Sequence, residues 1–198
     1  MKSSRKNGMR LDSPQQQEVL TSPVRIEIIE RMQGSEPSSI GDIARRMGRS
    51  AASLYHHFRK LLAAGVLIEE GRRRAGRRWE ALYRLAAPRF HMDLDQSSQR
   101  NVRCYRQSAG ALLRLTERNF ADALELGELV SSGRYRNLVA NLKKARLSKT
   151  GLARVNRLLQ EIHDVMREED ARGTGQPCAL TTVLLPLLDT TQRNKESK

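Results

Sequence analysis

Residues 50–67, SAASLYHHFRKLLAAGVL, constrain the fold of this chain more than any other segment. Leu54, Phe58 and Leu61 recur at positions i, i+4 and i+7, a spacing that predicts a short helix with one apolar stripe. A serine stands where the helix N-cap belongs, and a glycine follows where a helix ends. The opposite face is small or polar, which leaves it free to contact a partner; it carries Ala52, Ser53, His56 and Arg59.

Two further helices are predicted upstream. One covers residues 39–47 and opens with a Ser-x-x-Asp capping pattern, and Gly48 interrupts it before the next N-cap. The other starts at Ser22 with a cap followed by proline, and Gly34 to Pro37 end it. Its expected buried side is Val24, Ile28, Ile29 and Met32. Two short helices joined by a glycine-containing turn are typical of a helix-turn-helix, whose second helix enters the major groove of DNA.

A β-hairpin is predicted directly after these helices. Residues 66–68 form a short apolar strand, and residues 79–85 alternate apolar and charged side chains as a strand does. A solvated loop is one interpretation of the basic run between them. Its position after a helix-turn-helix favours another, a wing that approaches a minor groove or its phosphates. The run contains Arg72, Arg73, Arg74, Arg77 and Arg78.

These residues together resemble the winged helix-turn-helix of the ArsR-like class of bacterial transcriptional regulators. That class reads Ser-x-x-Ser-x-x-x-His-Leu-x-x-Leu-x-x-Ala-Gly-Leu through its recognition helix. The corresponding places are taken here by Ser50, Ser53, His57, Phe58, Leu61, Ala64, Gly65 and Val66. The likeness covers about residues 20–87, and it implies a DNA-binding regulator that acts as a homodimer. Many metal-sensing members carry a Cys-x-Cys site near this helix, and residues 1–103 contain no cysteine, which argues against sensing by that site.

The charge balance agrees with a polyanionic partner. The formal net charge is +14, from 36 basic and 22 acidic residues. Phosphate neutralisation dominates nonspecific affinity for nucleic acid. A basic chain would also suit RNA or a membrane surface, and the helix-turn-helix selects double-stranded DNA. No apolar run is long enough to span a bilayer, the first residues lack the apolar centre of a signal peptide, and two cysteines make no disulfide framework, so a cytoplasmic location is expected.

The candidate DNA-binding residues lie on two elements. Candidates for contact with base edges are Ser50, Ser53, His56 and Arg59, and Ala52 on the same face is a further DNA-binding candidate. Lys60 and the five wing arginines are the candidates for phosphates. The pair His56-His57 is not expected to chelate a metal, because adjacent helical residues point about 100° apart. His91, Asp93 and Asp95 are read as a solvated linker. No phosphate loop, nucleophile elbow or zinc-protease motif is present, so neither an enzyme nor a cofactor is expected.

The predicted fold class is mostly α, with four parts along the chain. Residues 1–17 are expected to be a disordered basic lead-in, and residues 18–87 the winged helix-turn-helix. Residues 88–189 are expected to be a helical dimerisation or effector domain, and residues 190–198 a polar tail.

The expected helical domain contains two amphipathic helices. Residues 97–126 carry a long stripe formed by Val102, Tyr105, Ala109, Leu112, Thr116 and Phe120. The second helix is capped by Ser148 and carries Leu152, Val155, Leu158, Leu159, Ile162, Val165 and Met166. Residues 133–149 fit a strand or a helix equally, and residues 180–185 are expected to form a short strand. Cys104 and Cys178 are expected to be buried structural thiols.

The first stripe is too long to bury under a winged helix, so it is expected to pack on the same stripe of a second copy or on the helix at 152–165. The family resemblance favours the second copy, and therefore a homodimer. Two other functions remain open at this point. The winged helix could dock RNA or protein, or the C-terminal half could sense a small molecule or a metal and release DNA.

Overall fold

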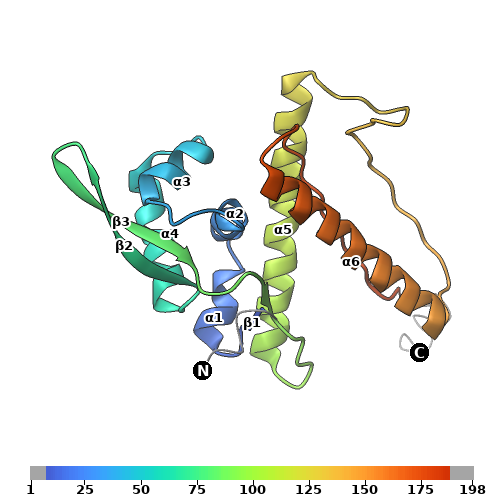
Figure 1. The fold of residues 1–198 in the computed structure, drawn as a ribbon. Helices are drawn as coiled ribbons and strands as arrows, with labels where there is room; N and C mark the ends of the chain where they lie inside the picture. Colours follow the sequence, from blue (N-terminus) through green and yellow to red (C-terminus); the bar gives the residue numbers. More distant parts are fainter. Residues whose placement is uncertain (1–7, 188–198) are drawn as a thin grey trace.

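The computed structural model describes residues 8–187, and it confirms a mostly α chain with an N-terminal winged helix-turn-helix (Figure 1). The elements of the winged helix are α2 (Pro23–Met32), α3 (Ile40–Arg46), α4 (Ala51–Ala63), β2 (Leu67–Ala75) and β3 (Arg78–Leu85). They are preceded by β1 (Met9–Arg10) and α1 (Pro14–Val19), and followed by β4 (Phe90–His91), α5 (Gln99–Leu126) and α6 (Lys149–Arg172). None of the helices in residues 8–187 is long and apolar enough to cross a membrane.

The helix-turn-helix forms where its caps and apolar stripes predict. The Ser39 hydroxyl accepts from the Asp42 N–H, and the Asp42 carboxylate accepts from the Ser39 N–H, which makes a complete capping box for α3. Ser50 caps α4 by accepting from the Ser53 N–H at 3.3 Å. The stripe of α4 is the centre of the core, with Phe58 stacked edge-on against Tyr83 at 5.4 Å between ring centroids. The predicted facing of this helix is therefore confirmed.

The hairpin is longer than predicted. The sequence places the end of the first strand near Ile68, whereas β2 continues through Ala75 because the arginine run pairs antiparallel with β3. A bulge lies between Glu69 and Gly71. Two hydrogen bonds of 2.9 Å, one in each direction, join the backbone of Ser38 to that of Tyr83. The hairpin is thus attached to the segment that enters α3.

Residues 9–17 are ordered, and this part of the predicted disordered lead-in is wrong; residues 1–7 lie outside the described residues. β1 pairs with β4, and Leu11 is 1% exposed in the core. Ser13 and Gln16 form a capping box for α1. Arg25 is buried and donates to two carbonyls at the end of α1. The globular unit consequently extends beyond 18–87, since Leu11, Phe90 and Met92 also pack in or on the core.

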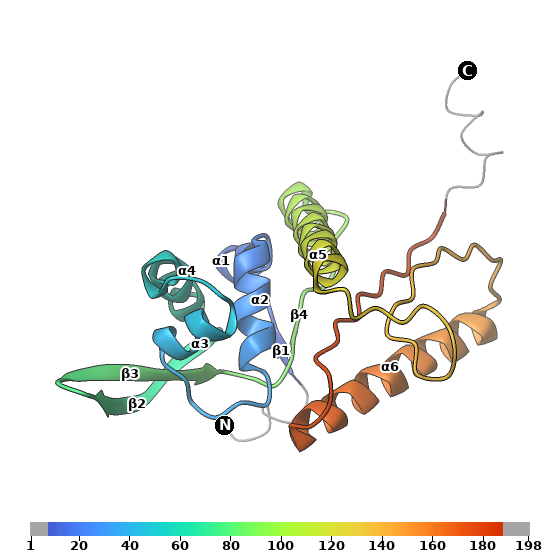
Figure 2. The same cartoon turned by 90° about the horizontal axis from the view of Figure 1, so that it is seen from above.

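α5 has the predicted length but presents a different face to the core. Its buried residues are Asn101, Cys104, Ala111 and Leu115, and this side of the helix packs against α1 and α2. Arg118 forms an ion pair with Glu27 of α2. The predicted stripe lies one residue around the helix; four of its residues are exposed, whereas Leu112 and Thr116 are half-buried. Figure 2 shows α5 running beside α1 and α2. Cys104 is buried as expected, whereas Cys178 is exposed, so that expectation is wrong.

The last part of the described chain is loosely packed. Ser148 caps α6 as predicted, accepting from the Gly151 N–H at 3.1 Å, but α6 has no buried residue. Residues 133–148 are neither strand nor helix. The strand expected at 180–185 is wrong, because within the described residues that segment has no neighbouring strand to supply backbone hydrogen bonds. It reaches α5 instead, where the Thr181 and Thr116 hydroxyls lie 2.6 Å apart. The expected tail, 190–198, lies outside the described residues.

Candidate nucleic-acid interface

The outer face of α4 is the centre of the candidate interface. Ala52, Ser53, Tyr55, His56 and Arg59 are exposed on it, opposite the buried stripe. Tyr55 is 61% exposed, so it does not stack in the core. The sequence-predicted base contacts therefore share one solvent-facing surface of a rigid helix, which is the geometry that a recognition helix requires.

Two serines of this face also hold the start of the helix. The Ser50 hydroxyl accepts from the Ser53 N–H, and the Ser53 hydroxyl donates to the Ser50 carbonyl at 2.7 Å. A hydroxyl offers one proton and two lone pairs, so Ser50 keeps its proton and one lone pair, and Ser53 keeps two lone pairs. Ser53 can still accept a hydrogen bond from a base amino group, and Ser50 can still donate one to a phosphate. Both serines therefore stabilise the start of α4 within the protein, independently of any contact with DNA.

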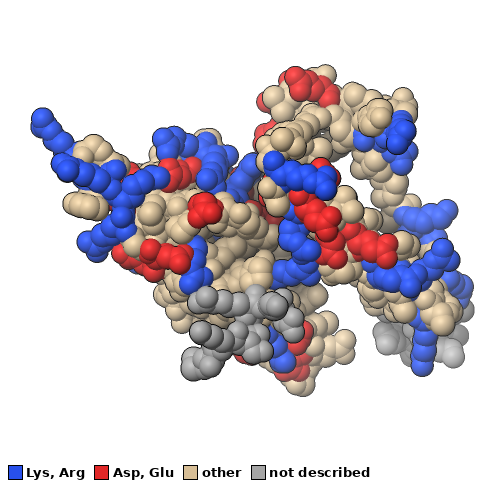
Figure 3. Space-filling view, in the orientation of Figure 1, with Lys and Arg blue, Asp and Glu red and all other residues tan. Residues whose placement is uncertain are grey.

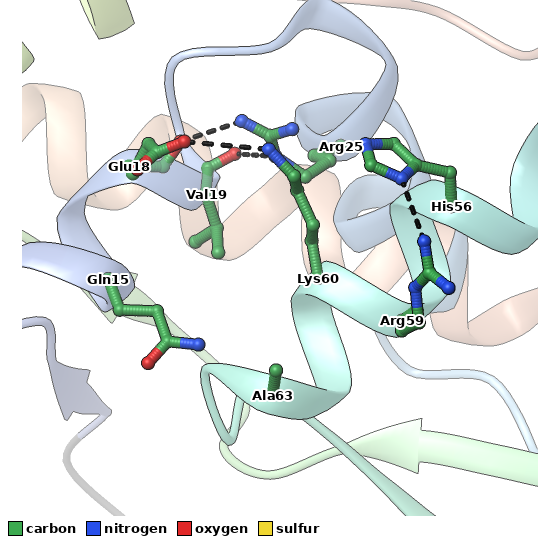
Figure 4. A pocket seen from close by; sticks show the side chains of 8 residues that line it. All are labelled: Gln15, Glu18, Val19, Arg25, His56, Arg59, Lys60 and Ala63. Carbon is green, nitrogen blue, oxygen red and sulfur yellow. Dashed lines mark hydrogen bonds and ion pairs between the residues drawn. The ribbon is translucent and has the colours of Figure 1, made fainter.

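The basic residues of α4 differ in how freely they face solvent. Arg59 Nη2 lies 3.4 Å from His56 Nδ1, and both side chains are exposed. Lys60 turns toward α1, where its ammonium lies 3.5 Å from the Glu18 carboxylate (Figure 4). These residues line an open hollow of about 330 Å³ between α1 and α4, together with Gln15, Val19, Arg25 and Ala63. Lys60 is thus partly neutralised, unlike Arg59.

His57 belongs to the interior of the domain. Its Nδ1 is buried and has no hydrogen-bond partner within the described part of the chain. Burial lowers the pKa of His57, and electrostatic interactions with Arg25, His56, Arg49 and Lys60 lower it further. His57 therefore belongs to the packing of the domain and not to the outer face of α4. Across residues 8–187, no group of three His, Cys, Asp or Glu side chains could hold a metal ion.

The wing carries its arginines in two different ways. Arg77 and Arg78 are exposed at the tip, where Gly76 adopts a φ of +60° that favours glycine. Arg72 lies 3.5 Å from Glu69 in an exposed pair, and Arg74 Nε donates to the Gly76 carbonyl at 3.3 Å. Figure 3 shows basic side chains covering the end of the hairpin that projects from the domain.

Arg73 is not a free tip residue. Its Nη2 lies 2.8 Å from Asp42 and 3.1 Å from Glu80, so it joins the wing to the start of α3. Burial alone would raise the pKa of Asp42. Hydrogen bonds from the Ser39 N–H and hydroxyl, from Arg73 and from Arg45 outweigh that effect and lower it to about 2. Arg73 therefore differs from the other four wing arginines, whose side chains face solvent.

Sequence reasoning missed several residues beside this surface. Arg45 and Arg46 are exposed on the last turn of α3, next to the turn that leads into α4. Trp79 is 68% exposed and pairs across the hairpin with Arg74. The two α3 arginines could have been found from their place at the end of the first helix of the motif, which crosses the DNA backbone in helix-turn-helix proteins.

This part of the chain is similar to a known protein family. Residues 20–70 match the family model described as a helix-turn-helix domain. A search of curated proteins finds no match. Among solved structures, the chain is similar to a multiple antibiotic-resistance repressor (MarR) from Listeria monocytogenes 4b F2365, with 10% sequence identity, a TM-score of 0.26, and coverage of 77% of this chain and 74% of that chain. Residues 20–70 are a helix-turn-helix domain, and the β2–β3 hairpin that follows makes it winged.

Proposed function

We propose that this protein is a DNA-binding transcription regulator that acts as a homodimer. The observation that carries the proposal is the exposed polar face of α4, held rigid by a buried apolar stripe and followed at once by an arginine-bearing wing. Winged helix-turn-helix domains use such a helix in the major groove and such a hairpin along the adjacent minor groove or backbone. The geometry supports this use over a protein-docking role, because the exposed face is polar.

The proposed contacts divide into those that read sequence and those that hold phosphate. Ser53, His56 and Arg59 project from the middle of the exposed face and would contact base edges, with Ala52 allowing close approach. Arg77 and Arg78 would hold phosphates or enter the minor groove. Phosphate contacts are also proposed for Ser50, Lys60, Arg72, Arg74, Arg45 and Arg46. Arg73 would not contact DNA itself; its ion pairs would fix the position of the wing relative to α3.

The homodimer is proposed from the unburied stripe of α5. Val102, Tyr105 and Phe120 are each 40–43% exposed on a helix whose neighbouring face, about 100° around, already packs against α1 and α2. Leu113 and Leu124, both 53% exposed, widen the same apolar surface. An apolar surface of this length favours a protein partner, and a second copy of the chain supplies the same stripe. Two-fold symmetry then predicts a roughly palindromic operator with half-sites about 34–36 Å apart, or a multiple of that distance.

The proposal is tested by selecting bound sequences from a random duplex pool with the full-length protein. Enrichment of one palindromic motif is the expected result. Equal retention of random duplex and a structured RNA would contradict the proposal and favour an RNA-docking role. The His56→Ala variant, which the structure predicts to fold normally because His56 is exposed, should enrich a less specific motif in the same selection.

A further inference from the structure

Residues 134–157 carry a dense positive charge. This segment has eight lysines and arginines and no aspartate or glutamate, in a protein of net charge +14. It covers most of the irregular stretch between α5 and α6 and the first turns of α6. The eight basic residues are all exposed; they are Arg134, Arg136, Lys143, Lys144, Arg146, Lys149, Arg154 and Arg157.

Two of these cations, Arg157 and Arg134, interact with neighbours inside residues 8–187 and still remain exposed. Arg157 lies 3.7 Å from Glu161, in a pair whose side chains are 70% and 60% exposed. Such an exposed ion pair contributes little to stability, so Arg157 remains available to another partner. Arg134 stacks over the ring of Tyr135 at 5.6 Å, and Tyr135 is itself 84% exposed. Like charges at this density repel one another. Binding of a polyanion to the segment would neutralise these charges and relieve the repulsion.

The position of the segment separates it from the candidate interface. Figures 1 and 2 show the wing at one side of the molecule, and α6 with the preceding segment at the other, beyond α5. In Figure 3 basic side chains gather at both of these sides. The positive end of the α6 dipole lies within the segment and adds to its field. Long irregular connections within a small protein are frequently functional.

We propose that residues 134–157 form a second surface for duplex DNA, which binds phosphates of a segment other than the one at α4 and the wing. This inference rests on the proposed function, since the winged helix is what brings duplex DNA to the protein. The surface has long, flexible cationic side chains on an irregular backbone and the start of one helix, so it would hold phosphates without reading sequence. Because the two surfaces face different sides, one assembly would join two segments of duplex.

The test compares two full-length variants that lose the same charge. The first changes Arg134, Arg136, Lys143 and Lys144 to Gln; the matched control changes the exposed α5 residues Arg100, Arg103, Arg106 and Arg114 to Gln. Affinity for random-sequence duplex is measured against salt concentration. Removing one phosphate interaction should reduce the slope of log affinity against log salt by about 0.9, so the first variant should reduce the slope by up to about 3.6. The control should reduce it much less.

A capture assay then asks whether two duplexes are held together. One duplex is fixed to beads, a second is labelled and free, and the protein is added at limiting amount. The native chain and the control should retain the labelled duplex, and the first variant should not. Capture and salt slope both equal to native in the first variant would overturn the proposal, because bridging would then come from two winged helices of a dimer.

Other outcomes separate this inference from the proposed function. A changed sedimentation coefficient of the first variant without DNA would overturn the inference, since the segment would then contact a second copy. Tighter binding of a structured RNA than of duplex, abolished in the first variant, would overturn the choice of duplex DNA. Weaker duplex binding in the first variant, with native binding in an Arg59→Ala, Arg77→Ala, Arg78→Ala variant, would support the second surface and contradict the proposed function.

Discussion

Asp42→Asn tests how the wing is attached to the helix-turn-helix. The Asp42 side chain is only 14% exposed and accepts hydrogen bonds from Ser39 and Arg73. Burial opposes ionisation, but these bonds and one from Arg45 lower its pKa from 3.8 to about 2. Nearly two pKa units correspond to about 2 kcal/mol of preference for the ionised form. The amide keeps the shape but loses the charge, so the variant should lose about 1–2 kcal/mol of unfolding free energy at pH 7.

The lowered pKa of Asp42 determines at which pH its stabilising effect is present and at which pH it is lost. The pKa of Asp42 is lower in the folded protein than in the unfolded chain, so its stabilisation is present in full above the unfolded value of 3.8. It is lost as the pH falls through about 2. Denaturant unfolding of the full-length native chain and of Asp42→Asn should therefore differ at pH 7 and converge toward pH 2.

The control is Glu69→Gln, which removes the carboxylate of the exposed Arg72 pair and should change stability by less than about 1 kcal/mol. Trp79 is the single tryptophan and lies on the wing, so its fluorescence should shift in Asp42→Asn and stay unchanged in the control. A stability difference that stayed constant from pH 7 to pH 2, or equal stability at pH 7, would refute the role given to Asp42.

Four further outcomes are expected. Changing Arg77 and Arg78 to Ala should weaken binding to all duplex sequences and reduce the salt slope by up to about 1.8, measured by titration at several salt concentrations. His56→Ala should cost roughly 1–3 kcal/mol at particular operator positions in a mobility-shift series with single-base changes. Phe58→Ala should instead lower unfolding free energy by about 3–5 kcal/mol in denaturant unfolding, because it empties a core site. The full chain should sediment as a dimer and a chain ending after Asp95 as a monomer, and a monomeric full chain at micromolar concentration would contradict the role of α5.

The helix-turn-helix could be predicted because its local signals agree with its tertiary packing. The caps at Ser39 and Ser50 and the stripe around Phe58 each specify the same helices and the same buried side. The boundary at 18 failed for a different reason. Leu11 has only Met9 as an apolar neighbour in a polar segment, which is too short a pattern to mark an element, and its burial depends on β1 pairing with β4 far along the chain.

The facing of α5 shows where hydrophobic periodicity reaches its limit. Two stripes of residues run along α5 at similar helical spacing, and the stripe that the sequence predicts to be buried contains the larger apolar residues. The stripe that packs on α1 and α2 includes Asn101, Cys104 and Ala111, which are polar or small. Asn101 is buried because its side chain accepts from the Asp95 N–H at 2.7 Å and donates to the Asp93 carbonyl at 3.1 Å. A hydropathy pattern does not contain these loop interactions.

The sequence predicts which elements form the candidate site, but it does not predict the ion pairs between its residues. The sequence places five arginines on one hairpin, but only the register shows Arg73 opposite Glu80 and near Asp42. Lys60 likewise follows the helical pattern of a DNA-facing residue, and Glu18 of α1 turns it aside. In both cases an acidic partner far away in sequence decided the role of a basic residue.

Binding of duplex DNA with sequence preference by α4 and the wing is the property on which the proposed function depends. The most direct measurement is the equilibrium affinity of the full-length protein for its selected operator and for a scrambled duplex of the same length, at one physiological salt concentration. The structure predicts at least about a thousandfold preference for the operator, in the range of specific DNA-binding proteins. Equal affinities for the two duplexes would contradict the claim.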